Sequence, residues 1–178
     1  KFTAQFLGKN QAKYLEGKGQ GGQGDTAGYA LWTLDYGGWQ SDETTAAVAE
    51  YFLRYQNDRD HYEPSSRRPP SEQSFFTSTY VALRATKRYG TPEQRELNES
   101  RRQPVKQWLL KTPAIDTEDR VFRLRALHAV GAGEAALRQA TFDLLHTQGQ
   151  DGGWAQTATM ASDAYATGSV LVALHQAG

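Results

Sequence analysis

Two acidic residues stand at the starts of segments rich in Ala, Ser, Thr and Gly. Asp25 begins the run Asp-Thr-Ala, and Asp163 begins the run Asp-Ala-Tyr. A carboxylic acid that stays protonated in an apolar pocket can donate a proton to a substrate. A carboxylate at a helix start can instead accept hydrogen bonds from backbone N–H groups of the first turn. Asp25 and Asp163 are therefore either candidate catalytic acids that point into a shared mouth, or two helix caps.

A third segment has acids at the same place, at Glu118 and Asp119. This repetition favours the structural interpretation, because acids at helix starts complement the macrodipole.

Aromatic side chains lie in or near the same segments. A wall of such rings would hold an apolar molecule, and the π faces of the rings attract cations. The alternative is that the rings fill the core between helices. The candidate ligand-binding residues are Tyr29, Trp32, Phe76, Tyr80 and Tyr165.

These residues belong to an internal repeat. The four segments rich in small and aromatic residues share a Leu, at positions 34, 83, 127 and 174. A period of roughly 47 residues is typical of one helix pair per repeat. A more charged helix is predicted before each segment, over residues 3–16, 42–56, 92–111 and 134–147. Ser41 or Asp42 is the expected N-cap of the second of these helices. Pro104 is expected to kink or restart the third, because it removes one ladder bond.

The two kinds of helix differ in composition, as an inner ring packed closely and an outer ring facing water would require. An ordinary helical solenoid would show the same difference. The stretch between the last two helices, residues 148–154, favours the first arrangement. There Gly152 and Gly153 can take positive φ, Asp151 can bond the local backbone in an Asx-type turn, and Trp154 can bury a large ring. Gln148 is expected to form a hydrogen bond across the helix ends.

This stretch resembles the QW motif of squalene–hopene cyclases and oxidosqualene cyclases, which share an α/α-toroid fold with the β subunits of protein prenyltransferases. Arg138, Leu144, Gln148, Gly152 and Trp154 occupy family positions. The resemblance implies an all-α fold of four α-helical hairpins in an α/α-toroid arrangement that forms a partial barrel. Residues 1–178 would form a single domain of this kind. Four hairpins are fewer than a closed toroid contains, so the chain is expected to be part of a longer protein.

The resemblance also implies where a catalytic acid would lie. The cyclases use a D-x-D-D-T-A motif, and the nearest match is residues 22–27, where Gly22 and Gly24 replace the two earlier acids. By this alignment Asp25 survives and the proton donor is missing. The prenyltransferase branch needs a zinc ion held in part by Cys, and the chain has no Cys. No cofactor and no metal site are expected.

The longest predicted loop, residues 57–73, lies where a QW turn would be expected. Gln56 stands at the Gln position, and Asp58, Asp60 and Tyr62 follow it. We interpret this loop as a degenerate QW turn with an insertion. It is either a lip over the mouth of the barrel or a mobile surface loop.

Composition excludes some classes of protein. The 20 Lys and Arg balance the 20 Asp and Glu, so no nucleic-acid partner is expected. No apolar run of about 18 residues exists, so no transmembrane segment is expected. The first residue is Lys1, which suggests a processed protein or an excised segment, and the compartment stays open, export with the signal removed included.

Three functions are compatible with these observations. The first is a squalene-cyclase-like domain that lacks the catalytic acid and binds an apolar, isoprenoid-type molecule or a protein partner on its concave inner face. The second is a triterpene cyclase, an isomerase or lyase, whose acid lies elsewhere. The third is a structural repeat that serves self-association.

Overall fold

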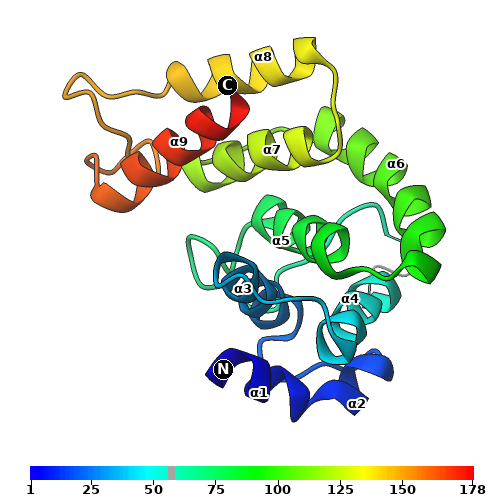
Figure 1. The fold of residues 1–178 in the computed structure, drawn as a ribbon. Helices are drawn as coiled ribbons and strands as arrows, with labels where there is room; N and C mark the ends of the chain where they lie inside the picture. Colours follow the sequence, from blue (N-terminus) through cyan, green and yellow to red (C-terminus); the bar gives the residue numbers. More distant parts are fainter. Residues whose placement is uncertain (56–58) are drawn as a thin grey trace.

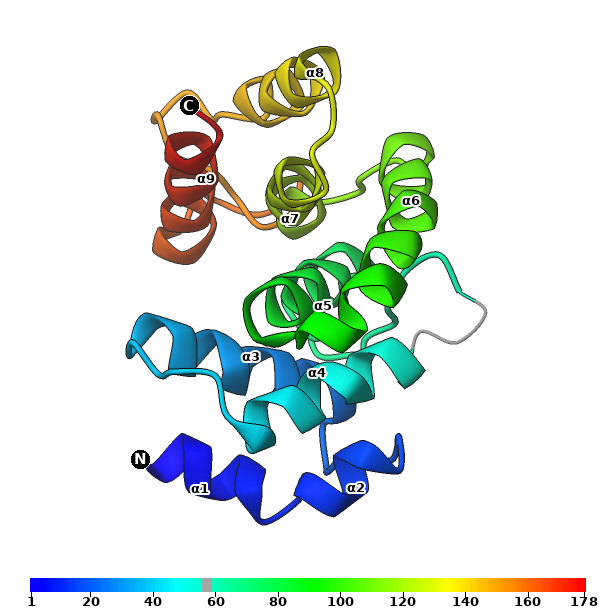
Figure 2. The same ribbon diagram turned by 45° about the vertical axis from the view of Figure 1, so that its right-hand side comes forward.

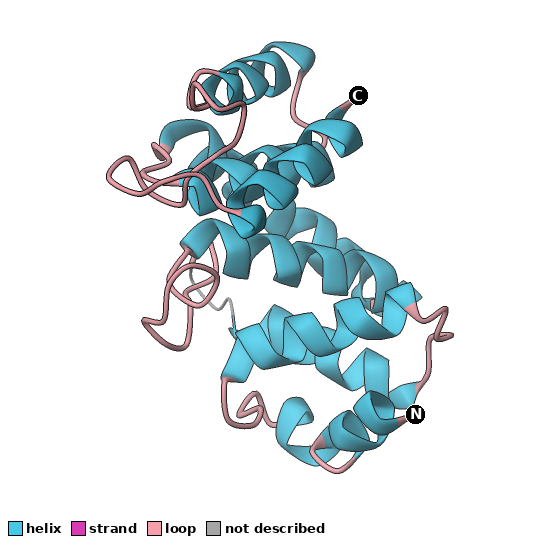
Figure 3. Cartoon of the chain, turned by 90° about the vertical axis from the view of Figure 1, so that its left-hand side faces the viewer, coloured by secondary structure: helices cyan, strands magenta, loops and turns pink. Residues whose placement is uncertain are grey.

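The computed structural model describes residues 1–55 and 59–178, and this part of the chain is all-α, with no strand (Figures 1 and 3). The predicted fold class is thereby confirmed. The elements are α1 (Phe2–Gly8), α2 (Gln11–Leu15), α3 (Gln23–Tyr36), α4 (Glu43–Tyr55), α5 (Phe75–Tyr89), the 3₁₀ turn η1 (Pro92–Gln94), α6 (Arg95–Lys111), α7 (Thr117–Ala129), α8 (Glu134–Leu145) and α9 (Ala164–Ala177).

Alternate helices form a continuous row. The segments rich in small and aromatic residues are α3, α5, α7 and α9, and each packs against the next (Figures 1 and 2). We call these four helices the inner row. The charged helices pack against it: α4 contacts α3 and α5, α6 contacts α5 and α7, and α8 contacts α7 and α9. The predicted alternation of two kinds of helix is therefore present, while closure into a toroid stays a prediction.

The helices of the inner row run parallel to one another, because residues of their first turns meet. Ser78 Oγ of α5 donates to Asp25 Oδ1 of α3 at 2.7 Å. Thr77 Oγ1 of α5 donates to Glu118 Oε1 of α7 at 2.9 Å. Tyr165 Oη of α9 donates to Glu118 Oε2 at 3.0 Å. All four amino-terminal ends thus lie on one rim of the row, which we call the amino-terminal rim.

Helix α5 joins the two halves of the core. Its Ala82 and Tyr89 pack with α3 and α4, and its Phe76 and Leu83 pack with the helices that follow. The approach of α3 to α5 depends on Gly28, since a Cβ at that position would lie 2.6 Å from a methyl carbon of Val81. The small residues of the inner row therefore allow its helices to pack closely.

The predicted QW turn is anchored by its tryptophan. Trp154 is 3% exposed, and its Nε1 donates to the carbonyl oxygen of Leu144 at 2.9 Å. The indole is a further donor to this carbonyl at the end of α8, which also accepts from Thr147 N at 3.1 Å and from Thr147 Oγ1 at 2.8 Å. The side chain ties the turn to the core.

The turn itself differs from the prediction in two details. Gly153 N donates to Asp151 Oδ1 at 3.1 Å, which confirms the Asx-type turn. Gly152 has φ +80°, but Gly153 does not have positive φ. Gln148 Nε2 donates to the carbonyl oxygen of Gly152 at 2.8 Å. The expected bond of Gln148 across the helix ends is therefore wrong, because the side chain folds back onto its own turn.

Two charged helices differ from their predicted ranges. The helix expected over residues 3–16 is broken into α1 and α2, where Asn10 Nδ2 donates back to the carbonyl oxygen of Phe6. The helix expected over 92–111 begins with η1, and α6 then continues through Pro104. The restart predicted at Pro104 is wrong. Pro104 is exposed, so the carbonyl that loses its partner can be solvated.

Asp42 is the cap of α4, as one of the two alternatives predicted. Its Oδ1 accepts from Thr45 N at 2.8 Å. The predicted end of this helix at Gln56 lies outside the described residues.

Candidate functional site

Asp25 is not a helix cap. It is 4% exposed in the first turn of α3, whose N-cap position is Gly22. Its carboxylate accepts from Ser65 N at 2.8 Å, Ser65 Oγ at 2.9 Å and Ser78 Oγ at 2.7 Å. The cap interpretation is therefore wrong for Asp25, because the loop before α5 and α5 itself supply the donors.

Asp163 is a helix cap. Its Oδ1 accepts from Tyr165 N at 2.8 Å and from Ala166 N at 3.0 Å. The backbone N–H of Ala166 is the main reason why the pKa of Asp163 lies below its ordinary value. An acid held in its ionised form is a poor proton donor at neutral pH. No hydrogen bond among the described residues connects Asp163 with Asp25, and the shared mouth of these two acids stays a prediction.

The described part of the long loop lies against the amino-terminal rim. Tyr62 N donates to Thr79 Oγ1 at 3.0 Å, and Tyr62 Oη donates to the carbonyl oxygen of Phe52 at 3.1 Å. Ser65 Oγ bonds the carbonyl oxygen of Gly22 at 2.8 Å as well as Asp25. These contacts favour the lip over the mobile loop. Gln56 and Asp58 of the predicted degenerate turn lie outside the described residues.

Glu118 is the buried acid of the amino-terminal rim, and the sequence interpretation treated it only as a helix-start acid. It is 4% exposed and accepts from Thr77 Oγ1 and Tyr165 Oη. Burial raises its pKa, the two hydrogen bonds partly offset this, and the nearby Asp116 and Asp119 raise it further. One signal could have indicated it: Glu118 stands nine residues before Leu127, as Asp25 does before Leu34.

The space beside Glu118 is very small. The cavity there has a volume of about 10 Å³, and its lining includes Pro70 of the loop and Tyr165 and Ser169 of α9. A volume of this size holds at most about one water molecule. The buried acid therefore has no room beside it for a hydrocarbon substrate.

Three of the five predicted ligand-binding aromatics lie together. Trp32 stacks on Tyr29 with ring centroids 5.9 Å apart, and Tyr80 meets its edge at 5.4 Å. Phe122 and Tyr36 complete the group around Trp32. We call these five residues the aromatic cluster.

The other two predicted aromatics lie elsewhere. Phe76 packs on Trp108 of α6, with centroids 4.7 Å apart. Tyr165 bonds Glu118 at the amino-terminal rim. Phe76 therefore lies apart from the other four, because the α5 face that carries it is turned toward a charged helix.

Two arginines occupy the faces of the aromatic cluster. The guanidinium carbon of Arg125 lies 4.5 Å from the centre of the Tyr80 ring, 4.8 Å from that of Trp32 and 5.1 Å from that of Phe122. Arg84 lies 5.3 Å from the centre of the Trp32 ring. Sequence reasoning missed both. Arg125 stands two residues before Leu127, at the repeat position that holds Trp32 in the first copy, and a charge at that position was the available signal.

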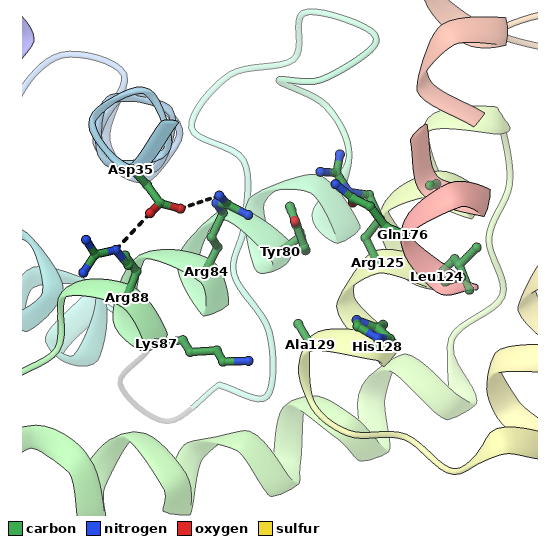
Figure 4. A pocket seen from close by; sticks show the side chains of 12 residues that line it. Asp35, Tyr80, Arg84, Lys87, Arg88, Leu124, Arg125, His128, Ala129 and Gln176 are labelled. Atoms are coloured by element: carbon green, nitrogen blue, oxygen red, sulfur yellow. Dashed lines mark hydrogen bonds and ion pairs between the residues drawn. The ribbon is translucent and has the colours of Figure 1, made fainter. Parts of the chain in front are cut away.

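A cavity of about 470 Å³ opens beside this cluster, between the carboxyl-terminal halves of α5, α7 and α9 (Figure 4). Its volume is within the range of small-molecule sites. Part of the lining is apolar, and part carries four cationic side chains and one carboxylate. The apolar and aromatic lining residues are Tyr80, Leu124, Ala129, Ala173 and Ala177; the others are Asp35, Arg84, Lys87, Arg88, Arg125, His128 and Gln176.

The charges in this lining do not balance. Asp35 pairs with Arg84 and also with Arg88, whose Nε lies 2.9 Å from Asp35 Oδ1. Figure 4 shows this carboxylate between the two arginines, with Lys87 extending from α5 toward α7. Among the described residues, Lys87 and Arg125 have no carboxylate partner. The cavity therefore has an excess of positive charge.

Comparison with known proteins does not change these assignments. No protein-family model matches the chain, and no curated protein or solved structure was found to match it. The resemblance to squalene cyclases therefore stays a prediction. In the part of the chain that the structure describes, no group of three His, Asp or Glu side chains could hold a metal ion. No described helix combines the length and apolar character needed to cross a bilayer.

Proposed function

We propose that the chain is a squalene-cyclase-like repeat domain that binds a small molecule with an apolar part on the face of its inner row, and does not convert it. The observation that carries this proposal is the cavity of about 470 Å³ beside the aromatic cluster. Aromatic and aliphatic side chains with a few polar groups are the usual lining of a small-molecule site.

A second candidate is a triterpene cyclase, and Glu118 favours it. A buried carboxylic acid with a raised pKa is the kind of group that protonates an alkene or epoxide. Asp25 and Asp163, the acids first considered, are held by hydrogen bonds to Ser65 and to the backbone of α9.

Two arguments favour binding over cyclisation. The space beside Glu118 is about 10 Å³, and the large cavity lies at the other end of the inner helices. The π faces that would stabilise a carbocation already carry Arg125 and Arg84. A guanidinium at that position repels a second cation, most strongly where water is excluded.

Binding can be tested by titrating the protein with farnesol or squalene and following tryptophan fluorescence. We expect saturable quenching, because Trp32 belongs to the aromatic cluster beside the cavity. Ala129→Phe places a ring in the cavity lining and should abolish the signal. Ala135→Phe, at an exposed position of α8, is the matched control and should leave it intact. No saturable signal with either compound would overturn the proposal.

Catalysis is tested by incubating the protein with squalene or oxidosqualene and analysing the extracted products. We expect no cyclic product. A cyclic product that disappears in Glu118→Gln and persists in Asp163→Asn would replace the binding function by a cyclase with Glu118 as its acid.

A further inference from the structure

We infer that the cavity between α5, α7 and α9 binds an anionic group of the phosphate or diphosphate kind, and that Arg125 and Lys87 hold it. This inference rests on the proposed function and specifies the chemistry of the ligand. An amphiphile is the expected occupant, with its charged end among the cations and its apolar part against Tyr80 and Leu124.

The first observation is the state of Arg125. Its side chain lies in the core and is 8% exposed, and its Nε and Nη2 are buried with no hydrogen-bond partner. The rings of Tyr80, Trp32 and Phe122 face its guanidinium carbon. Such contacts stabilise the charge but leave N–H donors unsatisfied, and a buried unsatisfied charged donor is costly. Both nitrogens are shielded from solvent, so a bound anion would act on Arg125 through the charge of its guanidinium group and not through these two donors.

The second observation is the charge around the cavity. Four cationic side chains face one carboxylate, Asp35, and that carboxylate is already shared by Arg84 and Arg88. Lys87 is exposed and has no acidic partner among the described residues. A multiply charged anion balances this excess better than a single carboxylate does. Guanidinium groups also match the spacing of phosphate oxygens.

A purely structural role explains only some of these cations. Arg84, Lys87 and Arg88 lie in the last turns of α5, where positive charge complements the helix dipole. Arg125 stands before the last turn of α7 and is surrounded by apolar side chains. A buried cation at that place gains little from the dipole, and a bound anion would add to the stabilisation that the three rings provide.

The test is calorimetric titration of the whole chain with four probes: inorganic phosphate, inorganic pyrophosphate, octyl phosphate and octanol. Octyl phosphate and octanol share the chain length and differ in the phosphate. We expect pyrophosphate to bind more tightly than phosphate, and octyl phosphate to bind at least about tenfold more tightly than octanol, as a charge-assisted contact predicts. Binding of the charged probes should weaken as salt is raised.

Variants locate the site. Lys87→Gln removes one exposed charge and should weaken pyrophosphate binding about threefold to tenfold. Arg125→Met should weaken it by more, and thermal melting shows whether that variant is folded. Lys13→Gln, an exposed lysine of α2 far along the chain from the cavity, is the matched control and should have no effect. Unchanged pyrophosphate affinity in Lys87→Gln would overturn the inference even if Arg125→Met fails to fold.

The outcomes separate this inference from the proposed function. Equal affinity for octanol and octyl phosphate would keep the apolar ligand and overturn the anion site. If pyrophosphate binds and octyl phosphate binds no more tightly than inorganic phosphate, the anion site is supported and the apolar part of the function is overturned. Binding of none of the four probes would overturn the anion site, while the separate farnesol titration decides the apolar function.

Discussion

Ser65 donates two hydrogen bonds to Asp25, from its backbone N at 2.8 Å and from its Oγ at 2.9 Å, although 40 residues separate them in the chain. Ser78 Oγ adds a third donor from α5. One buried carboxylate therefore holds the long loop, α3 and α5 together at the amino-terminal rim. The role of Asp25 that follows from this geometry is to hold structure in place.

Replacing Asp25 by Ala should destabilise the fold by about 2–4 kcal/mol, because the donors around it would be left without an acceptor. Urea denaturation followed by circular dichroism measures this. Asp25→Asn keeps one acceptor oxygen and should cost less. Asp163→Ala, which removes the half-buried cap of α9, is the comparison and should have the smallest effect. Equal losses in the free energy of unfolding of the Asp25→Ala and Asp163→Ala variants would contradict the larger structural role of Asp25.

Glu118 should make stability depend on pH. Burial raises its pKa in the folded protein above the ordinary value of 4.5, so the folded chain keeps a proton that the unfolded chain has lost. This stabilising contribution is complete below the unfolded pKa and is lost as pH rises through the folded pKa. The free energy of unfolding of Glu118→Gln, relative to the wild type, should therefore rise as the pH increases above 4.5, and should level off above the folded pKa of Glu118.

Urea titrations at several pH values test this, and Tyr165→Phe supplies a control of opposite sign. The Tyr165 hydroxyl helps to lower the pKa of Glu118, so its removal should extend the loss of stability to higher pH than in the wild type. Curves for Glu118→Gln and the wild type that stay parallel would mean that Glu118 does not titrate in this range.

The contact between α3 and α5 should tolerate no added methyl group. Gly28→Ala would place a Cβ 2.6 Å from Val81 Cγ2, and such overpacking costs about 1–3 kcal/mol. Gly168→Ala is the matched control within α9, since nothing lies within 4 Å of its Cβ position. It should stabilise the protein by about 0.5–1 kcal/mol. Thermal melting of both variants measures the difference. Two shifts of the melting temperature with the same sign would contradict the close approach of α3 to α5.

Trp154 should contribute both a ring and a hydrogen bond. Trp154→Phe loses the bond from Nε1 to the carbonyl oxygen of Leu144 and should cost about 1 kcal/mol. Trp154→Ala also leaves a cavity and should cost about 3–5 kcal/mol. Denaturant melts of the two variants give the two contributions separately. An exposed side chain such as Met160, changed to Ala, should have almost no effect.

The fold was largely predictable because it depends on repetition. The Leu residues at 34, 83, 127 and 174 mark four helices, and all four pack in succession. The repeat pattern predicted helix boundaries less well where a single local hydrogen bond decides whether a helix continues. Asn10 interrupts the first helix by bonding to the carbonyl oxygen of Phe6. The local competition between a side chain and the helix ladder leaves little trace in hydrophobic periodicity.

The site was less predictable because it depends on which face of a helix meets which neighbour. Asp25 and Glu118 occupy the same place in two repeats and both accept a bond from α5, yet the other donors come from a loop for Asp25 and from α9 for Glu118. Arg125 appears in the sequence as one of several charges on a helix. Its contact with three rings follows only from the packing of α3, α5 and α7.

The parallel course of α3, α5, α7 and α9 also gives the molecule a direction. Acids lie where α3, α7 and α9 begin, at Asp25, Glu118 and Asp163, and two arginines lie toward the end of α5, at Arg84 and Arg88, beside Asp35 of α3. An elongated guest with one negative end would experience this as an electrical gradient and would be seated head-first in a single orientation. Each further helix pair of the same kind would widen the row at right angles to that gradient without reversing it.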